Sequence, residues 1–335
     1  MESKSKYVAT ESEIKAAFSA ANLGEVLSFS PLGEGMFNAV YKVDTVGGSY
    51  ALKIAPNNKD TVMTYETDMI KTEVFWYKEM AEKCFVLVPK IYFEDCSKSI
   101  IGAEYFIMEL VDGTQLDKLK RNEEEKALCQ KKLCAQIADI HNIESEKYGY
   151  IQNGLFDTWS KAVRSMFENC VKDLEKYGKK SKRIARLIAY VDKFEDVLDK
   201  APATLVNYDI WDSNIIAKKL DGGDIKMTWI DPERGFYGDP LWDFICLDIS
   251  KMTLKDKRGT IEEYNKSAKI KAEINAETEI RYAFALGYMG AIQETEKFFR
   301  FKRFSEGWTF DVVSSAVYYK AALKTLKKYE RELLG

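Results

Sequence analysis

Two short polar segments, separated by a turn signal, constrain this chain more than any other feature. The first is residues 207–214, Asn-Tyr-Asp-Ile-Trp-Asp-Ser-Asn, and the second is residues 229–233, Trp-Ile-Asp-Pro-Glu. Apolar, β-branched residues lie beside each segment, as in short strands. Between them, residues 221–224, Asp-Gly-Gly-Asp, are typical of a tight hairpin turn. The pattern predicts two short antiparallel strands that bring the two polar segments together.

Such a hairpin would place three oxygen-bearing side chains near one another. They are the carboxylates of Asp209 and Asp231 and the carboxamide of Asn214, which follows Asp209 by five residues. Mg²⁺ prefers oxygen ligands and commonly shares its coordination with substrate phosphates. A carboxylate in the same place can orient a reacting hydroxyl group. The three residues therefore predict a site for phosphoryl transfer.

The first third of the chain contains a short glycine loop. Gly33 and Gly35 precede an expected strand at residues 39–43. Glycines allow a loop between two strands to lie close to phosphate groups. The same spacing also occurs in ordinary turns, and Asn38 stands where a third glycine would be expected. The loop is therefore a candidate phosphate-binding element only in combination with other features.

A lysine in the middle of an apolar strand is a second phosphate-binding candidate. Lys53 lies within residues 50–54, Tyr-Ala-Leu-Lys-Ile, where burial of an unpaired ammonium group would be costly. Lys53 either faces solvent from an edge strand, or it contacts nucleotide phosphates and pairs with a glutamate on a helix. Glu66 and Glu73, in the expected helix 64–83, are the candidate partners. We favour Glu73 because it directly precedes the most apolar part of that helix.

Together, these segments resemble the aminoglycoside phosphotransferase family, whose relatives include choline, homoserine, fructosamine and methylthioribose kinases. The family's catalytic loop has the form His-Gly-Asp-Leu-His/Trp-x-x-Asn and corresponds to residues 207–214. Its metal motif, Ile-Asp-Trp/Phe/Pro-Glu, corresponds to residues 230–233, followed by Gly-Asp-Pro at 238–240 and by Asp243. The resemblance extends over about residues 27–250.

The resemblance implies a kinase that phosphorylates a hydroxyl of a small molecule, such as an aminoglycoside-like antibiotic, an amino alcohol or a sugar. Asp209 would be the catalytic residue that orients this hydroxyl and accepts its proton late, since the transition state is loose. Asn214 and Asp231 would bind Mg²⁺. Lys53, paired with Glu73, would contact the phosphates of ATP, with GTP as the alternative nucleotide.

Residues 108–113 resemble the hinge that binds adenine in kinases. Backbone groups near Glu109 and Val111 would bind the adenine edge, and Met108 would lie behind the base. The alternative is an ordinary strand end with a turn at residues 112–113, Asp-Gly. The position of the segment between an expected strand and an expected helix favours the hinge.

Two residues depart from the family pattern. Asn207 and Tyr208 replace the usual His-Gly pair that opens the catalytic loop. Asparagine offers both a donor and an acceptor, so Asn207 is predicted to hold the loop as the histidine does.

Three further residues are expected to support the site. Asp243 is expected to accept hydrogen bonds from this loop, and Glu233 to lie behind the metal site. His141, the only histidine, matches a family histidine at a helix end and is predicted to pack rather than to act as a base.

These features predict an α+β protein with a protein-kinase-like two-lobe fold. Residues 1–110 would form a small nucleotide-binding lobe with an antiparallel sheet and one main helix. Residues 111–335 would form a larger, mostly helical lobe for catalysis and acceptor binding. Strands are expected at residues 26–31, 39–46, 49–55, 88–93 and 104–108, and helices at 64–83 and 126–142, among others. The charged run 251–271 is predicted to be a solvated insertion or a helix hairpin.

Composition agrees with an enzyme of this kind. Fifty basic and 53 acidic residues leave a net charge of −3, which does not favour binding to nucleic acid or to an anionic membrane. Six cysteines without Cys-x-x-Cys spacing indicate reduced thiols in a cytoplasmic protein. No segment resembles a signal peptide or a membrane span. We expect a monomer or a homodimer whose partner is a small-molecule hydroxyl acceptor.

Two other functions are compatible with parts of this pattern. A protein kinase needs an activation segment, whereas only seven residues separate Asp231 from Asp239 and no Ala-Pro-Glu follows. A pseudokinase that binds nucleotide and acts as a regulator or scaffold would keep the fold without turnover. Because Asp209, Asn214 and Asp231 are all present, we favour the enzyme.

Overall fold

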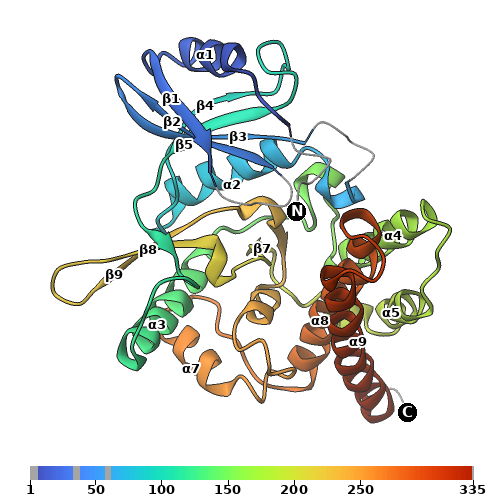
Figure 1. Ribbon diagram of the computed structural model, residues 1–335. Helices are drawn as coiled ribbons and strands as arrows, with labels where there is room; N and C mark the ends of the chain where they lie inside the picture. The colour runs from blue at the N-terminus through green and yellow to red at the C-terminus, as the bar shows by residue number, and fades with distance from the viewer. Residues whose placement is uncertain (1–6, 33–37, 57–61, 334–335) are drawn as a thin grey trace. The chain divides into compact units, whose positions relative to one another are not determined.

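The computed structural model describes residues 7–32, 38–56 and 62–333. The chain divides into two compact units. The first, here called the sheet unit, comprises residues 1–61, 68–121 and 211–233. The second, here called the helical unit, comprises residues 62–67, 122–210 and 234–335. Figure 1 traces the chain through both units, from helix α1 (Glu11–Ala20) to helix α9 (Glu306–Leu333).

A five-stranded antiparallel sheet with the order β1-β2-β3-β5-β4 is the main element of the sheet unit. The strands are β1 (Val26–Pro31), β2 (Ala39–Thr45), β3 (Gly48–Ile54), β4 (Ile91–Asp95) and β5 (Tyr105–Glu109). Side chains alternate between the two faces of a strand. Leu52 and Ile54 of β3 therefore share one apolar core with Phe18 of α1, whereas Lys53 points to the other face. Helix α2 (Met69–Lys83) contacts β4 and β5 and lies across the sheet from α1 (Figure 1).

Three elements differ from the predictions by more than a residue. The predicted helix 126–142 runs Glu123–Ile140, because the side chain of Asn122 caps its start by accepting the N–H of Glu125. Helix α2 begins at Met69 and not at residue 64, because Thr64–Glu66 forms a separate 3₁₀ turn and Asp68 adopts a left-handed conformation with φ of 51°. Strand β4 begins at Ile91 and not at residue 88, since Pro89 has no N–H group to donate to a neighbouring strand. The other predicted strands agree with the structure to within a residue.

The predicted hairpin is confirmed. Strands β8 (Ile215–Lys219) and β9 (Ile225–Trp229) pair in antiparallel fashion, and β6 (Thr114–Gln115) extends them to a three-stranded sheet. Gly222 and Gly223 in the turn have φ angles of 89° and 86°, which glycine adopts without strain. At the other end, the N–H of Ile230 donates to the carbonyl of Asn214 at 2.9 Å. The hairpin therefore places Asn214 beside the residue that precedes Asp231.

Helices make up most of the helical unit. They are α3 (Glu123–Ile140), α4 (Trp159–Glu175), α5 (Lys182–Lys193), α6 (Glu195–Leu198), α7 (Arg258–Ser267), α8 (Ala276–Arg300) and α9. Two short strands, β7 (Thr204–Val206) and β10 (Phe236–Gly238), pair with each other, and the 3₁₀ helix η6 (Pro240–Cys246) follows. Helices α8 and α9 lie side by side, and α4 packs against α8 (Figure 1). The predicted α+β class is confirmed.

The charged run 251–271 is neither the solvated insertion nor the helix hairpin that its composition predicts. It contains one helix, α7, which buries Thr260, Ile261 and Tyr264. Lys257 is also buried, and its ammonium group donates to the carbonyl oxygens of Leu247 and Asp248. Carbonyl oxygens can replace the water that a lysine loses on burial, so a charged sequence does not require an exposed segment.

Most cysteine side chains are buried in the described part of the chain. All six cysteines are free, and four of them are buried. Among the residues that the structure describes, no helix combines the length and the apolar character needed to cross a lipid bilayer.

Candidate active site

Lys53 is the centre of a charged cluster in the sheet unit. Its side chain is only 3% exposed, on the face of β3 opposite the apolar core. Its Nζ lies 2.6 Å from a carboxylate oxygen of Glu73 on α2. The same atom lies 2.7 Å from Asp231 and 3.1 Å from Glu233, both of which follow β9. Three carboxylates from two distant parts of the sequence therefore meet at one ammonium group.

These carboxylates determine the charge state of the lysine. Burial disfavours the ammonium form, but Asp231, Glu233 and Glu73 outweigh this effect and raise the pKa of Lys53 well above its usual range. Of the two predicted partners, Glu73 is in contact with Lys53. Glu66 belongs to the helical unit, where it pairs with Arg300. An edge-strand lysine facing solvent is therefore excluded.

The backbone at Asp231 is held in a strained conformation. Its φ of 57° lies in the left-handed region, which residues other than glycine rarely adopt. Its N–H donates to the hydroxyl of Tyr77 at 2.9 Å, and Tyr77 is buried on α2. Side-chain accessibility of 37% leaves the carboxylate of Asp231 partly open to solvent. Strain of this kind commonly persists where it aims a functional group.

Asn214 lies close to Asp231 in the structure of the hairpin. It ends the 3₁₀ turn Asp212–Asn214 and accepts the N–H of Ile230 through its carbonyl oxygen. Amide and carboxylate oxygens are ligands that Mg²⁺ accepts, and two protein ligands are typical where phosphates supply others. Asn214 and Asp231 therefore fit a magnesium ion by the chemistry of their side chains.

The other predicted nucleotide-binding residues are Gly33, Gly35, Met108, Glu109 and Val111. Gly33 and Gly35 lie outside the described residues. Met108 is buried on β5, and Glu109 ends this strand. The N–H of Glu109 donates at 2.8 Å to a backbone carbonyl just before β4, so this group is already used within the sheet. Val111 follows the strand and is half-buried. The adenine contacts of these residues stay a prediction.

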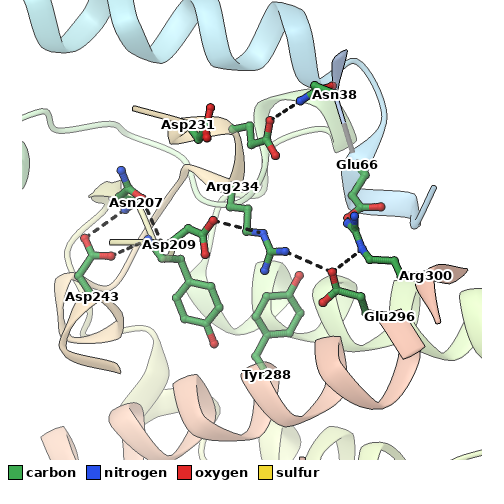
Figure 2. A network of polar contacts seen from close by, with 12 residues as sticks. Asn38, Glu66, Asn207, Asp209, Asp231, Arg234, Asp243, Tyr288, Glu296 and Arg300 are labelled. Carbon is green, nitrogen blue, oxygen red and sulfur yellow. Dashed lines mark hydrogen bonds and ion pairs between the residues drawn. The ribbon is translucent and has the colours of Figure 1, made fainter. Parts of the chain in front are cut away.

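Two residues that sequence reasoning did not assign to the site also contact the cluster. Asn38, at the start of β2, donates from its side-chain amide to Glu233 at 3.1 Å (Figure 2). Tyr77 holds the backbone of Asp231. The only sequence signal for Tyr77 is a hydroxyl within an otherwise apolar helix face, which is also common in ordinary cores.

In the helical unit, Asp209 lies in a loop that Asp243 holds (Figure 2). The two carboxylate oxygens of Asp243, on η6, accept the N–H groups of Asn207 at 3.1 Å and of Tyr208 at 2.6 Å. The side-chain oxygen of Asn207 then accepts the N–H of Asp209 at 3.1 Å. Both predictions about loop support, by Asp243 and by Asn207, are confirmed.

Tyr208 replaces a glycine of the family pattern and adopts the conformation that glycine would favour. Its φ is 60°. A tyrosine pays a steric penalty there, which burial and hydrogen bonding can offset. The ring is fully buried against Phe236 and Trp242, and its hydroxyl donates to the carbonyl of Ala285 at 2.6 Å. Tyr208 therefore attaches the catalytic loop to helix α8.

His141 supports the same loop through its contact with Asp243. It is buried at the end of α3, and its Nε2 lies 3.0 Å from Asp243. Its Nδ1 lies 2.8 Å from the hydroxyl of Tyr264. The predicted structural role of His141 is confirmed, because both ring nitrogens are engaged by neighbours of the loop.

A chain of alternating charges starts at Asp209 and was not anticipated from the sequence (Figure 2). Nε of Arg234 lies 3.7 Å from Asp209, and its guanidinium group also lies 3.4 Å from Glu296. Arg300 pairs with Glu296 and with Glu66. Glu296 and Arg300 are four residues apart on α8 and so share a helix face. That spacing was the only local signal, because the contact with Arg234 depends on tertiary structure.

Residues 28–256, which include the Lys53 cluster and the Asp209 loop, match the phosphotransferase enzyme family. The chain belongs to the phosphotransferase enzyme family. The resemblance seen in its sequence motifs is thereby confirmed. A comparison with curated proteins gave no match.

Several solved structures have the same fold. A structure described as an aminoglycoside phosphotransferase from Ralstonia eutropha has a TM-score of 0.63 at 16% identity, covering 94% of this chain and 98% of that one. One described as a fructosamine-3-kinase from Haemophilus somnus has a TM-score of 0.63 at 14% identity, covering 93% and 96%. A ternary complex of aminoglycoside phosphotransferase APH(4)-Ia with ADP and hygromycin B has a TM-score of 0.59 at 16% identity, covering 93% and 97%. The predicted protein-kinase-like two-lobe fold is confirmed.

The chain of alternating charges that starts at Asp209 lies near a further buried carboxylic acid, Asp311. Asp311 on α9 is only 5% exposed, and one of its carboxylate oxygens has no hydrogen-bond partner in the part of the chain that the structure describes. Burial, reinforced by the negative charge of Glu296, raises the pKa of Asp311 to about 7. Lys297, Arg300 and Arg234 oppose this shift without cancelling it.

The contacts of Asn207 predict how this position responds to substitution. Asn207→Ala leaves the N–H of Asp209 without its acceptor, which costs about 1–3 kcal/mol of loop stabilisation. We expect phosphoryl transfer by this variant to slow by roughly tenfold or more. Asn207→His, which restores the family residue, keeps an acceptor and should slow transfer less. Thermal stability and kcat are measured on both variants. A histidine variant that stays stable but loses about a thousandfold in kcat would show a chemical role for Asn207.

The raised pKa of Asp311 predicts a pH dependence of stability. Between about pH 4, the ordinary aspartate pKa, and about pH 7, the folded protein keeps a proton that the unfolded chain has lost. The free energy of unfolding should therefore fall across this window as pH rises and level off above it. Asp311→Asn removes the titration, so its stability should rise relative to wild type from pH 5 to pH 7. Urea denaturation at several pH values tests this, with exposed Asp221→Asn as the control. Parallel profiles for wild type and Asp311→Asn would contradict the assignment.

Proposed function

We propose that this protein transfers the γ-phosphate of ATP to a hydroxyl group of a small molecule in the presence of Mg²⁺. The observation that carries the proposal is the Lys53 cluster, in which a buried lysine contacts Glu73 at 2.6 Å and Asp231 at 2.7 Å. A lysine paired with a helix glutamate beside a metal-binding aspartate is the arrangement that phosphoryl transfer in kinase-like folds requires. Membership of the phosphotransferase enzyme family supports the same reaction class.

In this proposal, Lys53 binds the phosphates of ATP through its permanently charged ammonium group. The raised pKa of Lys53 supports this role, because a neutral amine would not attract phosphate. Gly33 and Gly35 would cover the phosphates, Met108 would lie behind the adenine, and Glu109 and Val111 would bind its edge. The use of the Glu109 N–H within the sheet makes Val111 our preferred backbone donor. GTP is the alternative nucleotide.

Asn214 and Asp231 would hold Mg²⁺. When bound, this ion neutralises the negative charge that develops on the phosphate oxygens. The partly open carboxylate of Asp231 suits this role, and the hydrogen bond from its N–H to Tyr77 keeps the carboxylate in one orientation. Asn38 would restrain Glu233 through its side-chain amide, so that Glu233 stays directed at Lys53.

Asp209 would orient the acceptor hydroxyl and take its proton late in the transfer. Three features support this role: the loop is tied to Asp243, Asn207 accepts the N–H of Asp209, and Arg234 lies 3.7 Å from its carboxylate. A nearby guanidinium favours the ionised form of a carboxylate, and this form can accept a hydrogen bond from a hydroxyl. Arg234 is in turn held by Glu296.

The acceptor is best identified by direct assay. Relatives of known structure include complexes with hygromycin B and with gentamicin, and one is described as a fructosamine-3-kinase. Arg234 and Arg300 already pair with Asp209, Glu296 and Glu66, so this part of the helical unit does not demand a charged acceptor. The panel should therefore contain sugars as well as aminoglycosides, choline and hydroxyamino acids. ADP release with phosphate appearing on an acceptor supports the kinase, whereas nucleotide binding without transfer to any acceptor favours a pseudokinase.

We further propose that residues 1–110 act as the nucleotide-binding lobe and residues 111–335 as the catalytic and acceptor-binding lobe. The location of Lys53 and Glu73 in the first range and of Asp209 in the second supports this division. We also propose a cytoplasmic enzyme, which six free cysteines support, acting as a monomer or a homodimer.

Asp209→Asn tests the catalytic assignment. The variant should lose roughly 10²-fold or more in kcat, the scale of one positioned acid–base group, while its affinity for ATP stays nearly unchanged. Kinetics on an identified acceptor and calorimetry with ATP give the two measurements. Asp212→Asn is the matched control and should keep its kcat, since Asp212 pairs with Arg121 and takes no part in the proposed transfer. Near wild-type kcat in Asp209→Asn would show that another residue has this role.

Asp231→Ala tests the metal assignment. Removing this carboxylate should abolish the increase in ATP affinity that Mg²⁺ produces, because it takes away the main charged ligand. Calorimetry of ATP binding with and without Mg²⁺ measures the difference. Asp221→Ala, at the exposed turn of the same hairpin, should retain the full Mg²⁺ effect. An equal Mg²⁺ effect in Asp231→Ala and wild type would remove Asp231 from the metal site.

A further inference from the structure

Helix α7 contributes one hydroxyl to the support of the catalytic loop. The hydroxyl of Tyr264 lies 2.8 Å from Nδ1 of His141, and both side chains are buried. Nε2 of His141 lies 3.0 Å from Asp243, whose two oxygens accept the N–H groups of Asn207 and Tyr208. A continuous set of hydrogen bonds therefore runs from the charged segment 251–271 to the residues that precede Asp209.

The direction of each hydrogen bond follows from the groups involved. A carboxylate has no proton to donate, so Asp243 can only accept from Nε2 of His141. A neutral imidazole that donates from Nε2 must accept at Nδ1. The hydroxyl of Tyr264 supplies that proton at 2.8 Å, whereas its alternative acceptor, the carbonyl of Ile270, is at 3.4 Å. The hydroxyl has one proton, and the shorter contact has the better geometry.

We propose that Tyr264 is a positioning residue for phosphoryl transfer: it donates to Nδ1 of His141 and so holds the ring in the orientation in which Nε2 donates to Asp243 and Asp243 holds the loop of Asp209. This step rests on the proposed catalytic role of Asp209. The other tautomer would direct an unprotonated Nε2 at the carboxylate, and the two acceptors would repel each other. The loop amides of Asn207 and Tyr208 would then lose a firmly held acceptor.

The tautomer can be measured without any activity. His141 is the only histidine in the chain, so histidine labelled with ¹⁵N gives the spectrum of one ring. Two-bond ¹H–¹⁵N spectra of the full chain at neutral pH distinguish a protonated from an unprotonated ring nitrogen. The proposal requires protonated Nε2 and unprotonated, hydrogen-bonded Nδ1 in the wild type. A protonated Nδ1, alone or together with Nε2, overturns it, and this measurement needs no variant.

Tyr264→Phe tests the consequence for the loop. The ring of His141 should lose one of its two hydrogen bonds while Asp243 keeps it as the Nε2–H tautomer, and the amides of Asn207 and Tyr208 should exchange with solvent about three- to tenfold faster, the scale of one hydrogen bond. On an identified acceptor, kcat should fall by a similar factor at unchanged KM for ATP. Tyr282→Phe is the matched control, because it removes a buried hydroxyl that has no hydrogen-bond partner among the described residues. It should leave the tautomer, the exchange and kcat unchanged.

Two outcomes of the variant would overturn the inference. Unchanged amide exchange in Tyr264→Phe would show that Tyr264 does not act on the loop. A protonated Nδ1 in this variant would show that Asp243 does not hold the ring as a donor from Nε2. Both readouts are independent of turnover, so a protein that transfers no phosphate would contradict the proposed function and leave this test intact.

Discussion

A single positive charge inside the sheet unit accounts for the arrangement of the elements around it. An unpaired ammonium ion buried in protein costs several kcal/mol. Lys53 therefore cannot remain buried on the face of β3 opposite the apolar core without carboxylates nearby. Helix α2 supplies Glu73, and the end of β9 supplies Asp231 and Glu233. Three segments far apart in the chain must therefore meet before the charge is satisfied. The same requirement keeps the side chains that we assign to nucleotide and metal binding in contact before either ligand arrives.

The helical unit uses the opposite sign of charge for a similar purpose. Asp243 is fully buried, and backbone N–H groups and His141 satisfy its carboxylate. The loop that Asp243 holds contains Tyr208 in a left-handed conformation, just as the metal-site loop contains Asp231 in one. In both places, a hydrogen bond to a rigid element keeps a strained backbone in place. In these two places a buried charged group therefore lies near a strained residue, and both places are ones to which we assign chemistry.

Local signals were sufficient for several parts of this structure. The Asp-Gly-Gly-Asp turn predicted the hairpin because two consecutive positive φ angles suit glycine, and the apolar stretch after Glu73 predicted which glutamate faces the sheet. Other parts escaped prediction for physical reasons. Charge alone suggested that the segment around Lys257 is solvated. In the structure, backbone carbonyl groups replace the water around the ammonium group of Lys257. Arg234 has no partner within four residues that would reveal its contacts with Asp209 and Glu296, because those residues come from a separate loop and from α8.

The sequence by itself determined the family, the fold class and the chemical types of the side chains at the site. These depend on short motifs with constrained spacing, and spacing along a chain is a local property. Only the tertiary structure decided which charges neutralise one another and which hydroxyls and amides hold the loops in place. Hydrogen bonds and ion pairs act over a few ångströms in space, whatever the separation in sequence. The contact of Tyr264 with His141 links residues 123 positions apart, and no local pattern contains that information.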